Sequence, residues 1–381
     1  MNTTSVLDCA GESPVVNFTW NDTSEADRYI LTNSYSKTDA FFITKVFPTI
    51  LFFGVLNNGV FIFVLFRVHR MRTTLNSLLA SLAISDTLFL ALVIGEKTIR
   101  LRSSVFSNDL YPFSSAAYTI LQSFIEMTFQ ASLIAITTVA YERYNRVCNS
   151  TVKTSSPIQK THCGFQCVMQ THLVQLLAFI WGIGFLFSLL LLPSNVRYKR
   201  ICIIWPPTEN YTEYPSTILK QNIEGGMQIY YNISQGIPFV VAFLVNTYLY
   251  IQLVKTLKVH TKSVAKEHVD IFTKRRKRKQ RITHMLLINS AVYFVCLAPY
   301  MLTRLLGGLV AIFNYDIAST LLLDDNAIFM NLCRTLMYLN SAINSILYTA
   351  LSSIYRIAYM EAFCLSKPVT QDIRISELRC T

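Results

Sequence analysis

The stretch Met227–Val254 reads MQIYYNISQGIPFVVAFLVNTYLYIQLV and contains no Asp, Glu, Lys or Arg. A helix crosses the roughly 30 Å of bilayer hydrocarbon with about 20 residues, so this stretch is long enough to span a membrane. Pro238 lies inside it and predicts a local interruption of the backbone hydrogen bonds. A core helix of a large soluble protein is apolar as well, so one such stretch does not decide the fold.

Six further stretches of similar length decide it. They lie at about 41–66, 74–95, 112–141, 173–193, 283–303 and 326–350. Short polar connections join them and leave too little polar sequence to cover seven apolar helices in water. The chain of 381 residues is 52% hydrophobic and 15% charged, whereas a soluble domain is roughly 25% charged. We therefore predict an all-α membrane protein, a bundle of seven transmembrane helices.

An eighth, shorter helix is expected after the bundle. Apolar pairs recur every four residues at Ile354/Tyr355, Ala358/Tyr359 and Ala362/Phe363, which predicts an amphipathic helix on the membrane surface. Cys364 at its end is a candidate for palmitoylation. The predicted organisation is an extracellular glycosylated N-terminal tail (1–40), the bundle (41–350), the surface helix (351–364) and a cytoplasmic tail (365–381).

The net charge of +12 is unevenly distributed. The connections at 67–73, 142–172 and 255–282, together with the residues after 350, hold 22 Lys+Arg and 6 Asp+Glu, or +16. The remainder carries −4. Basic connections face the cytoplasm, so we expect a multi-pass plasma-membrane protein with its N-terminus outside and its C-terminus inside. The excess therefore indicates contact with membrane lipid and not with nucleic acid.

Glycosylation motifs agree with this orientation. Candidate acceptors on the outer side are Asn2, Asn17, Asn21 and Asn210. The first 40 residues are polar and net acidic and carry no signal-peptide pattern, so the first helix is expected to translocate them.

Ionisable residues within the apolar stretches are costly in lipid and are expected to face the bundle interior. Asp86 lies deepest. It either joins helices through neutral hydrogen bonds or forms a cation site that acts as a switch. Nearer the outer side lie Glu126, Arg304 and Arg334.

Several short motifs occur in a fixed order along the seven stretches. They are Asn58, Leu82-Ala83-Ile84-Ser85-Asp86, Glu142-Arg143-Tyr144, Trp181, Pro238, Cys296-Leu297-Ala298-Pro299 and Asn340-Ser341-Ala342-Ile343-Asn344-Ser345-Ile346-Leu347-Tyr348. In this combination the chain resembles the rhodopsin-like (class A) G-protein-coupled receptors, from about residue 41 to residue 364. The resemblance implies a receptor in which an outer ligand opens a cytoplasmic cleft that binds a heterotrimeric G protein.

The resemblance also assigns roles to residues. It implies that Glu142, Arg143 and Tyr144 serve G-protein coupling, with Glu142 as the partner of Arg143. It implies that activation involves Asn58, Pro238, Pro299, Asn344 and Tyr348. It further implies a sodium ion as an allosteric modulator at Asp86, Ser132, Asn340, Ser341 and Asn344, while a dry polar network remains the alternative. No other cofactor is expected.

The chain departs from the family in three places. Tyr118 stands where the family has a cysteine, so Cys202 lacks its usual partner, and either a Cys9–Cys202 bridge or a free thiol remains. Leu297 replaces a tryptophan and Ser345 replaces a proline, which suggests a divergent activation switch. The basic run 274–279 replaces the acidic partner that many relatives offer to the coupling arginine, so we expect measurable basal activity.

The family resemblance also narrows the ligand. Ile125 stands where amine receptors carry an aspartate, and Tyr338 where retinal proteins carry a lysine, which disfavours both ligand classes. The remaining candidate ligand-binding residues are Glu126, Gln130, Arg304 and Arg334. A structural Glu126–Arg334 salt bridge is the alternative.

Acidic residues in the outer connections suit a basic, amidated peptide. The segment Asn340–Tyr348 with the Thr-Ala-Leu-Ser-Ser that follows it resembles neuropeptide receptors, and this resemblance implies the neuropeptide receptor group. A chemosensory receptor for small molecules and a seven-helix transporter are the alternatives. An enzyme is not expected, since no nucleophile–base set or hydrolase motif occurs.

Overall fold

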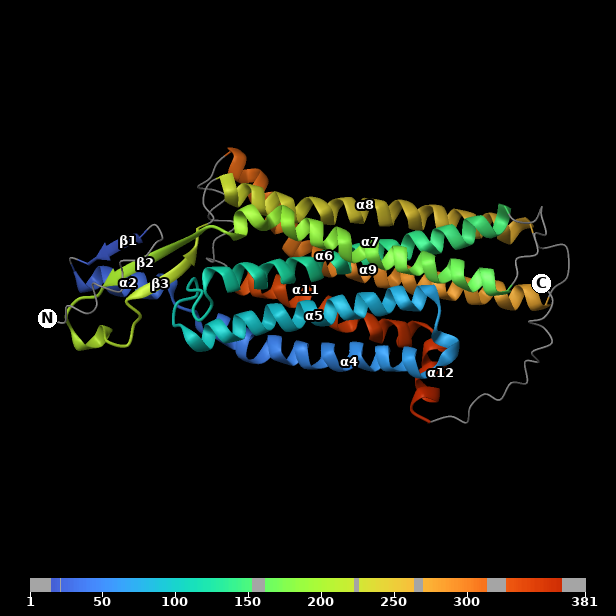
Figure 1. Ribbon diagram of the computed structural model, residues 1–381, viewed down its shortest axis with the longest axis horizontal. Helices are drawn as coiled ribbons and strands as arrows, with labels where there is room; N and C mark the ends of the chain where they lie inside the picture. The colour runs from blue at the N-terminus through green and yellow to red at the C-terminus, as the bar shows by residue number, and fades with distance from the viewer. Residues whose placement is uncertain are drawn as a thin grey trace.

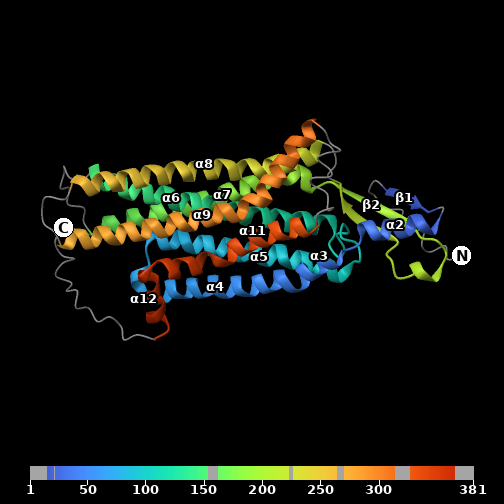
Figure 2. The ribbon, with the colours of Figure 1, turned by 180° about the vertical axis from the view of Figure 1, so that it is seen from behind.

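The computed structural model describes residues 15–20, 22–152, 162–222, 226–263, 270–313 and 327–364. Long helices lie side by side, and a small β-sheet lies at one end of them (Figure 1). The long helices of the described chain are α4 (Phe47–Arg67), α5 (Thr74–Ser103), α6 (Ser115–Val152), α7 (His162–Asn195), α8 (Gly226–Ser263), α9 (Asp270–Phe313) and α11 (Ala327–Leu351). We call the end with the sheet the sheet end. The opposite end is the α12 end, named for the short helix α12 (Ser353–Ala362) (Figure 2).

Most of these helices satisfy the length and apolarity of a membrane span. Six such segments lie in the described chain: Lys37–Arg67, Thr74–Ser103, Ser115–Val147, Thr171–Asn195, Gly226–Thr256 and Gln280–Phe313. The seventh expected span, α11, is not in this group, although it packs against α4, α5 and α9 in the same bundle. Its polar residues Asn340, Ser341, Asn344 and Ser345 are buried, so neighbouring helices shield them from lipid. The predicted seven-helix fold is confirmed.

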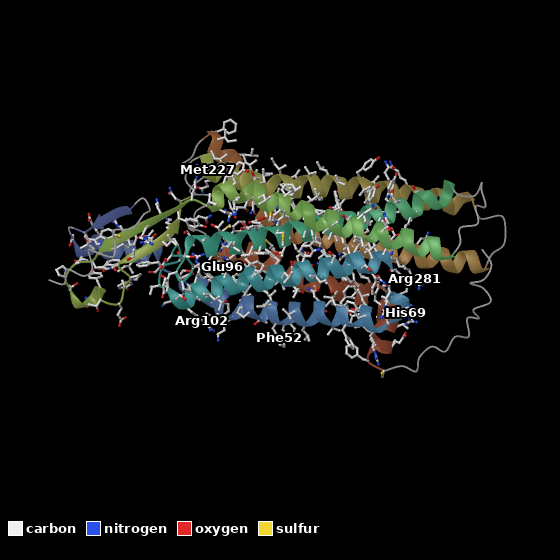
Figure 3. All side chains as sticks on the ribbon, in the orientation of Figure 1. Phe52, His69, Glu96, Arg102, Met227 and Arg281 are labelled. Atoms are coloured by element: carbon white, nitrogen blue, oxygen red, sulfur yellow. The ribbon has the colours of Figure 1, made fainter. Side chains whose placement is uncertain are left out.

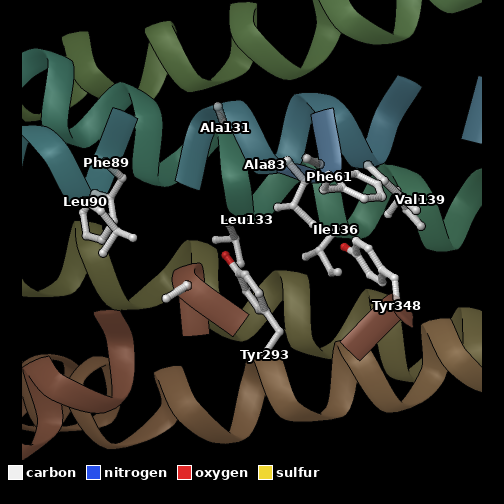
Figure 4. Packing of buried hydrophobic residues seen from close by; sticks show 14 of the residues in the cluster. Phe61, Ala83, Phe89, Leu90, Ala131, Leu133, Ile136, Val139, Tyr293 and Tyr348 are labelled. Atoms are coloured by element: carbon white, nitrogen blue, oxygen red, sulfur yellow. The ribbon is translucent and has the colours of Figure 1, made fainter. Parts of the chain in front are cut away.

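The helix α6 lies at the centre of the bundle, where it packs against α5, α7 and α8. Buried apolar residues from all seven long helices form one contiguous core. Figure 4 shows part of this core, in which Tyr293 and Tyr348 approach Leu133 and Ile136 of α6. Such continuity matters because packing, not hydrophobicity, holds helices together within lipid.

The helices extend beyond their apolar stretches. The first begins at Lys37, as α3 (Lys37–Phe41) and a π-helical turn (Phe42–Val46) that lead into α4. In α5, eight residues follow Gly95, where the predicted span ended. Within them Glu96 and Arg100 form a salt bridge of 2.7 Å between Oε1 and Nη1. Charge marked the limit of the apolar stretch but not of the helix, because i,i+4 ion pairs are compatible with helical backbone.

At the sheet end, two segments that were expected to be a tail and a loop form one sheet. Strand β1 (Val15–Thr19) runs parallel to β2 (Tyr198–Ile204), and β2 runs antiparallel to β3 (Thr217–Gln221). Aromatic rings cover this sheet together with the short helix α2 (Thr23–Asn33): Trp20, Tyr29, Phe106, Trp205, Tyr211 and Tyr214. The result is a small aromatic core of its own. Burial and the negative charge of Asp109 raise the pKa of Tyr29, so its hydroxyl stays neutral in this core.

The amphipathic helix is confirmed as α12, which lies across the end of the bundle opposite the sheet (Figure 2). Its residues Tyr355, Ala358 and Ala362 are buried against the bundle. The Tyr355 hydroxyl donates to Asn76 Oδ1 at 2.7 Å. Arg70 and Glu361 form a salt bridge of 2.5 Å that joins α12 to the connection after α4.

Candidate functional site

A cavity of about 330 Å³ lies among the helices near the sheet end. Figure 3 labels one of its lining residues, Glu96, which lies toward the sheet, whereas His69 and Arg281 mark the opposite end of the bundle. The lining side chains come from α5, α6, α7, α8, α9, α11 and strand β3: Phe89, Val93, Glu96, Lys97, Arg100, Tyr118, Gln122, Ile125, Glu126, Phe129, Asn195, Gln221, Gln228, Tyr231, Asn232, Gln235, Tyr300, Met301, Arg304, Arg334, Met337 and Tyr338.

Glu126 of α6 is buried in the wall of this cavity. Its Oε1 accepts a hydrogen bond from Gln235 Nε2 and a longer one, 3.5 Å, from the Tyr231 hydroxyl. Both donors lie on α8. The expected Glu126–Arg334 salt bridge is not among the ion pairs of the described residues, so that alternative is wrong. Neutral donors on the adjacent helix satisfy the carboxylate instead.

Arg304 of α9 lies near the same carboxylate. Its Nη1 donates to Asn232 Oδ1 at 3.2 Å and its Nη2 to the Tyr300 hydroxyl at 3.1 Å. Its guanidinium lies 5.4 Å from the ring centroid of Tyr300 and 5.8 Å from that of Tyr231. Two aromatic faces and two neutral acceptors therefore hold this cation in the cavity wall.

Arg334 of α11 also lines the cavity, but it is held more loosely. Its one hydrogen bond in the described structure runs from Nη1 to Asn331 Oδ1, at 3.3 Å and within the same helix. Of the four predicted ligand-binding residues, Glu126, Arg304 and Arg334 are thus brought together around one cavity.

Gln130 is the exception. It is buried and lines a different, largely apolar groove on the side of the bundle between α6, α7 and α8. Its amide nitrogen and oxygen have no hydrogen-bond partner among the described residues. Gln130 is therefore not part of the cavity lining that contains Glu126, and its role in ligand binding stays a prediction.

The apolar pattern did not include the end of α5, which also lines the cavity. Lys97 and Arg100 both contribute to the wall, beyond the predicted end of the span. Arg100 donates to the carbonyl oxygens of Asp109, at 2.9 Å, and Ser107, at 2.5 Å. The i,i+4 spacing of Glu96 and Arg100 was the one sequence signal for this extension.

Asp109 belongs to the acidic residues of the outer connections, which were expected to suit a basic peptide, but the structure does not expose it to a ligand. It is buried, and its Oδ1 accepts from the backbone N–H groups of Tyr111, at 3.1 Å, and Leu219, at 3.3 Å. The carboxylate joins the connection after α5 to strand β3 and is not available to a ligand.

Tyr118 occupies the place of the family cysteine. Its ring is buried, lies 6.0 Å from the Arg100 guanidinium and makes an edge contact with Tyr198 at 6.4 Å. Cys202 of β2 is buried and disulfide-bonded, so the free-thiol alternative is wrong. Cys9, the suggested partner, lies outside the described residues, and the Cys9–Cys202 bridge stays a prediction.

Deeper in the bundle, a polar cluster surrounds the fully buried Asp86. Ser132 Oγ donates to its Oδ1 and Asn344 Nδ2 to its Oδ2, both at 2.7 Å, and Ser341 adds a further hydrogen bond. Asn340 is buried, but neither its amide oxygen nor its amide nitrogen has a partner among the described residues. Four of the five predicted sodium-site residues are therefore brought into one hydrogen-bonded cluster.

Asn58 links α4 to α11 beside this cluster. Its Nδ2 donates to the Ser341 carbonyl at 3.0 Å, and Ser345 Oγ donates to its Oδ1 at 2.9 Å. Ser345, the departure from the family's proline, thus satisfies the second half of the Asn58 amide. The helix α11 runs unbroken through this position, as its missing proline predicts.

The predicted hinge residues lie inside continuous helices, Pro238 in α8 and Pro299 in α9. Leu297, which replaces the family's tryptophan, is buried in the core. One turn below, the Tyr293 hydroxyl lies 3.4 Å from Ser132 Oγ. Tyr348 packs its ring against Phe61 and Tyr355, with centroids 5.2 and 5.8 Å apart.

Near the α12 end, the Glu142-Arg143-Tyr144 motif lies on α6. Glu142 Oε1 accepts from Arg146 Nε at 2.5 Å, and its Oε2 lies 3.3 Å from His172 Nε2 of α7. The expectation that Glu142 pairs with Arg143 is therefore wrong. Arg143 Nε is buried without a partner among the described residues. Residues three or four apart face each other on a helix, whereas adjacent ones do not.

Modification sites are described in part. Asn210 is exposed in a 3-10 turn between β2 and β3, and Asn17 lies in β1. Asn2 and Asn21 lie outside the described residues. Cys364 is an exposed free thiol just after α12. The side chains of the basic run 274–279 also lie outside the described residues.

Comparisons with known proteins agree with this geometry. A family model described as "7 transmembrane receptor (rhodopsin family)" matches residues 57–348, more than half of the chain. Neuromedin-U receptor 2 of Homo sapiens is 25% identical over 83% of this chain and 70% of its own length. Somatostatin receptor type 2 of Sus scrofa is 22% identical over 92% and 83%. Histamine H2 receptor of Cavia porcellus is 24% identical over 78% and 72%.

Members of this family are receptors of the plasma membrane and not enzymes. The family match, the seven-helix bundle and the motifs placed within it lead to one assignment. The chain is a multi-pass membrane receptor and belongs to the rhodopsin family of seven-transmembrane receptors.

Proposed function

We propose that this receptor binds an extracellular peptide in the cavity at the sheet end and activates a heterotrimeric G protein at the α12 end. The cavity itself is the observation that carries the proposal, because its wall combines charged, amide and aromatic side chains in one volume of about 330 Å³. Peptides offer carbonyls, amides and charged ends to match such a lining. Two of the three relatives are named for neuromedin-U and somatostatin, which supports a peptide ligand.

A small amine is the second candidate, since one relative is a histamine receptor. Ile125 argues against it. This residue is buried and lines the cavity at the place where the family's amine receptors carry an aspartate. An aliphatic side chain cannot neutralise an ammonium group, so we favour the peptide.

The proposed orientation puts the sheet end outside the cell. The connections at the α12 end, with the tail, carry +16 and the remainder −4, which favours a cytoplasmic α12 end. The exposed Asn210 near β2 and β3 suits a glycan on the outer side. Enzymatic removal of N-glycans should shift the electrophoretic mobility of wild-type receptor more than that of the Asn210→Gln variant. An equal shift in both would exclude a glycan at this position.

Coupling is proposed to occur beside Arg143. Its Nε atom lacks a partner among the described residues, and Glu142 is occupied by Arg146. A cation with an unpartnered N–H near this end of α6 suits the carbonyl-rich C-terminus of a helix from a G protein. The exposed Cys364 after α12 suits palmitate, which would add to the contact of α12 with lipid.

A sodium ion near Asp86 is proposed as a modulator of this coupling. The fit rests on acceptor oxygens: the amide oxygens of Asn340 and Asn344 are buried without partners among the described residues. A carboxylate with neutral oxygens suits a hard monovalent cation. In membranes from expressing cells, sodium should lower agonist affinity and basal nucleotide exchange in wild type but not in Asp86→Asn. The proposal is contradicted if sodium changes neither agonist affinity nor basal nucleotide exchange in wild type and in Asp86→Asn.

Expression of the receptor with a promiscuous G protein tests the main proposal. A library of short peptides is applied, and agonist-stimulated nucleotide exchange is measured for wild type and Arg143→Ala. We expect at least one peptide to stimulate wild type and the response to be lost in the variant, with surface expression as the control. A library of biogenic amines that stimulates the receptor where peptides do not would replace the peptide with the second candidate.

A further inference from the structure

The cavity at the sheet end carries more positive than negative side chains. The charged residues in its lining are Glu96, Lys97, Arg100, Glu126, Arg304 and Arg334. Two carboxylates thus face four cations. An imbalance of this kind in a partly dehydrated volume is unfavourable unless a ligand or counter-ion supplies the missing negative charge.

Both carboxylates are already engaged. Glu96 pairs with Arg100 at 2.7 Å on the same helix. Glu126 accepts hydrogen bonds from Gln235 and Tyr231 and lies within electrostatic reach of Arg304. Lys97 and Arg334 remain, and neither forms an ion pair with a carboxylate in the part of the chain that the structure describes.

These two cations are neighbours. Lys97 lies on α5 and Arg334 on α11, two helices that pack against each other. Both side chains line the same cavity. Arg334 has a single weak hydrogen bond to a described residue, Asn331. Two unpaired cations that repel each other across a cavity form a site for an anion.

We propose that Lys97 and Arg334 together bind an anionic group of the ligand, specifically a carboxylate. The arginine fork can donate hydrogen bonds to both carboxylate oxygens, while the lysine ammonium adds a third donor. This inference rests on the proposed function, because it assigns a charge to the ligand that the receptor recognises. The carboxylate is either the free C-terminus of a peptide or an acidic side chain, and both present the same group.

This inference reverses the charge expected from the outer connections. Their acidic residues suggested a basic, amidated peptide, but Asp109 is buried in backbone hydrogen bonds. The inner wall, which encloses the ligand, is the better guide to ligand charge. A peptide whose only end group is an uncharged amide would leave the two cations unpaired.

A direct test uses purified receptor and two small probes, N-acetyl-L-glutamate α-amide, which carries one carboxylate, and its neutral analogue N-acetyl-L-glutamine α-amide. Thermal unfolding is measured at equal probe concentration and equal ionic strength. A ligand that binds the folded state raises Tm, so the glutamate derivative should raise the Tm of wild type more than the glutamine derivative does. Lys97→Gln and Arg334→Gln should each weaken binding of the glutamate derivative by about tenfold or more. Arg102→Gln, an exposed cation on the same helix, is the matched control and should bind as wild type does.

Equal Tm shifts from the two probes in wild type, or unchanged binding in both cavity variants, would overturn the proposal. This result does not depend on any signalling response, so the anion site can fail while the receptor still responds to peptides.

Signalling then identifies the source of the carboxylate. Peptide agonists are compared as free acids and C-terminal amides, and with Glu or Gln at internal positions. Loss of potency on amidation assigns the C-terminus, and loss on Glu→Gln replacement assigns a side chain. In either case Lys97→Gln should remove the difference between the charged and neutral peptides. Agonists with equal potency in all four forms would show that the ligand does not use this anion site.

Discussion

Buried polar side chains gather in two regions of this bundle, and the two differ in how their charges are satisfied. Around Asp86, one carboxylate receives hydrogen bonds from the neutral side chains of Ser132, Asn344 and Ser341. In the cavity at the sheet end, the cations Lys97 and Arg334 face open volume without a carboxylate partner in the described chain. Hydrogen bonds in the first region hold helices together, whereas the second region has positive charges that a ligand could neutralise.

The difference follows from position. Asp86 is fully buried where α5, α6 and α11 meet, so Ser132 of α6 and Asn344 of α11 can both donate to it. The cavity lies near the end of the bundle, where α5 and α9 extend beyond their apolar stretches and a volume remains between them. Loss of charge should therefore have opposite consequences in the two regions: destabilisation around Asp86, and little effect or stabilisation at Lys97.

The largest effect is expected from Asp86→Ala. The change leaves the buried Ser132 and Asn344 donors without their acceptor, which costs about 2 to 4 kcal/mol and lowers Tm accordingly. Thermal unfolding of purified receptor measures it. Ser123→Ala is the control, because the Ser123 hydroxyl bonds only to the Thr119 carbonyl of its own helix, at 2.9 Å. A loss in Asp86→Ala no greater than in the control would mean that the cluster does not hold the helices together.

A smaller loss is expected from Glu126→Leu. The variant removes the acceptor of Gln235 and Tyr231 and leaves Arg304 with neutral partners, which should cost about 1 to 3 kcal/mol. Glu126→Gln keeps an acceptor oxygen and should lose less, as the same unfolding measurement can show. Equal stability of the two variants would show that the acceptor oxygen at position 126 does not stabilise the bundle. Glu126 would then resemble Lys97 and Arg334, whose charges have no carboxylate partner in the described chain.

A modest effect is expected from Ser345→Ala, which removes the hydrogen bond from Ser345 to Asn58 across α4 and α11. Such bonds between membrane helices are worth about 0.6 kcal/mol on average. Thr349→Ala, one turn further along and exposed, is the matched control because its hydroxyl bonds only to the Ile346 carbonyl. Indistinguishable Tm values for the two variants would show that Ser345 does not stabilise the helix pair.

The smallest effect on the ligand-free receptor is expected from Lys97→Gln. This variant removes the repulsion between Lys97 and Arg334 without breaking any ion pair of the described residues. The free energy of unfolding should therefore stay equal or rise by no more than about 0.5 kcal/mol, and Tm should stay equal or rise with it. A clear fall in Tm would show that Lys97 is paired in the free receptor. That result would remove the contrast between the two regions.

Several parts of the fold could be predicted from residue pattern alone. The seven spans, the amphipathic α12 and the meeting of Asp86 with Ser132 and Asn344 are all confirmed. Each depends on regular helical spacing or on the free-energy cost of a polar group in lipid. Both can be judged from the residues of a single helix, without knowledge of its neighbours. The three-stranded sheet was missed because it joins segments that are about 180 residues apart and have no hydrophobic alternation to mark them.

The errors at the sites have a common origin. Glu142 pairs with Arg146 and His172 and not with Arg143, and Gln130 faces a lateral groove and not the cavity. In both cases the position along the sequence was not converted into helical geometry. Adjacent side chains such as those of Glu142 and Arg143 point about 100° apart, and four residues carry Gln130 about 6 Å further along α6 than Glu126. Lys97 was missed because it follows the end of an apolar stretch, yet the helix continues and carries it to the cavity.

The sequence alone determined that the protein crosses the membrane seven times, which side of it is basic, and which polar residues must turn away from lipid. These properties are set by apolar length and by charge, and both are sums over residues that can be read without knowing contacts. Only the tertiary structure decided which buried charges find partners. Pairing depends on distances between helices, and it satisfies Asp86 and Glu126 while leaving Lys97 and Arg334 open to a ligand.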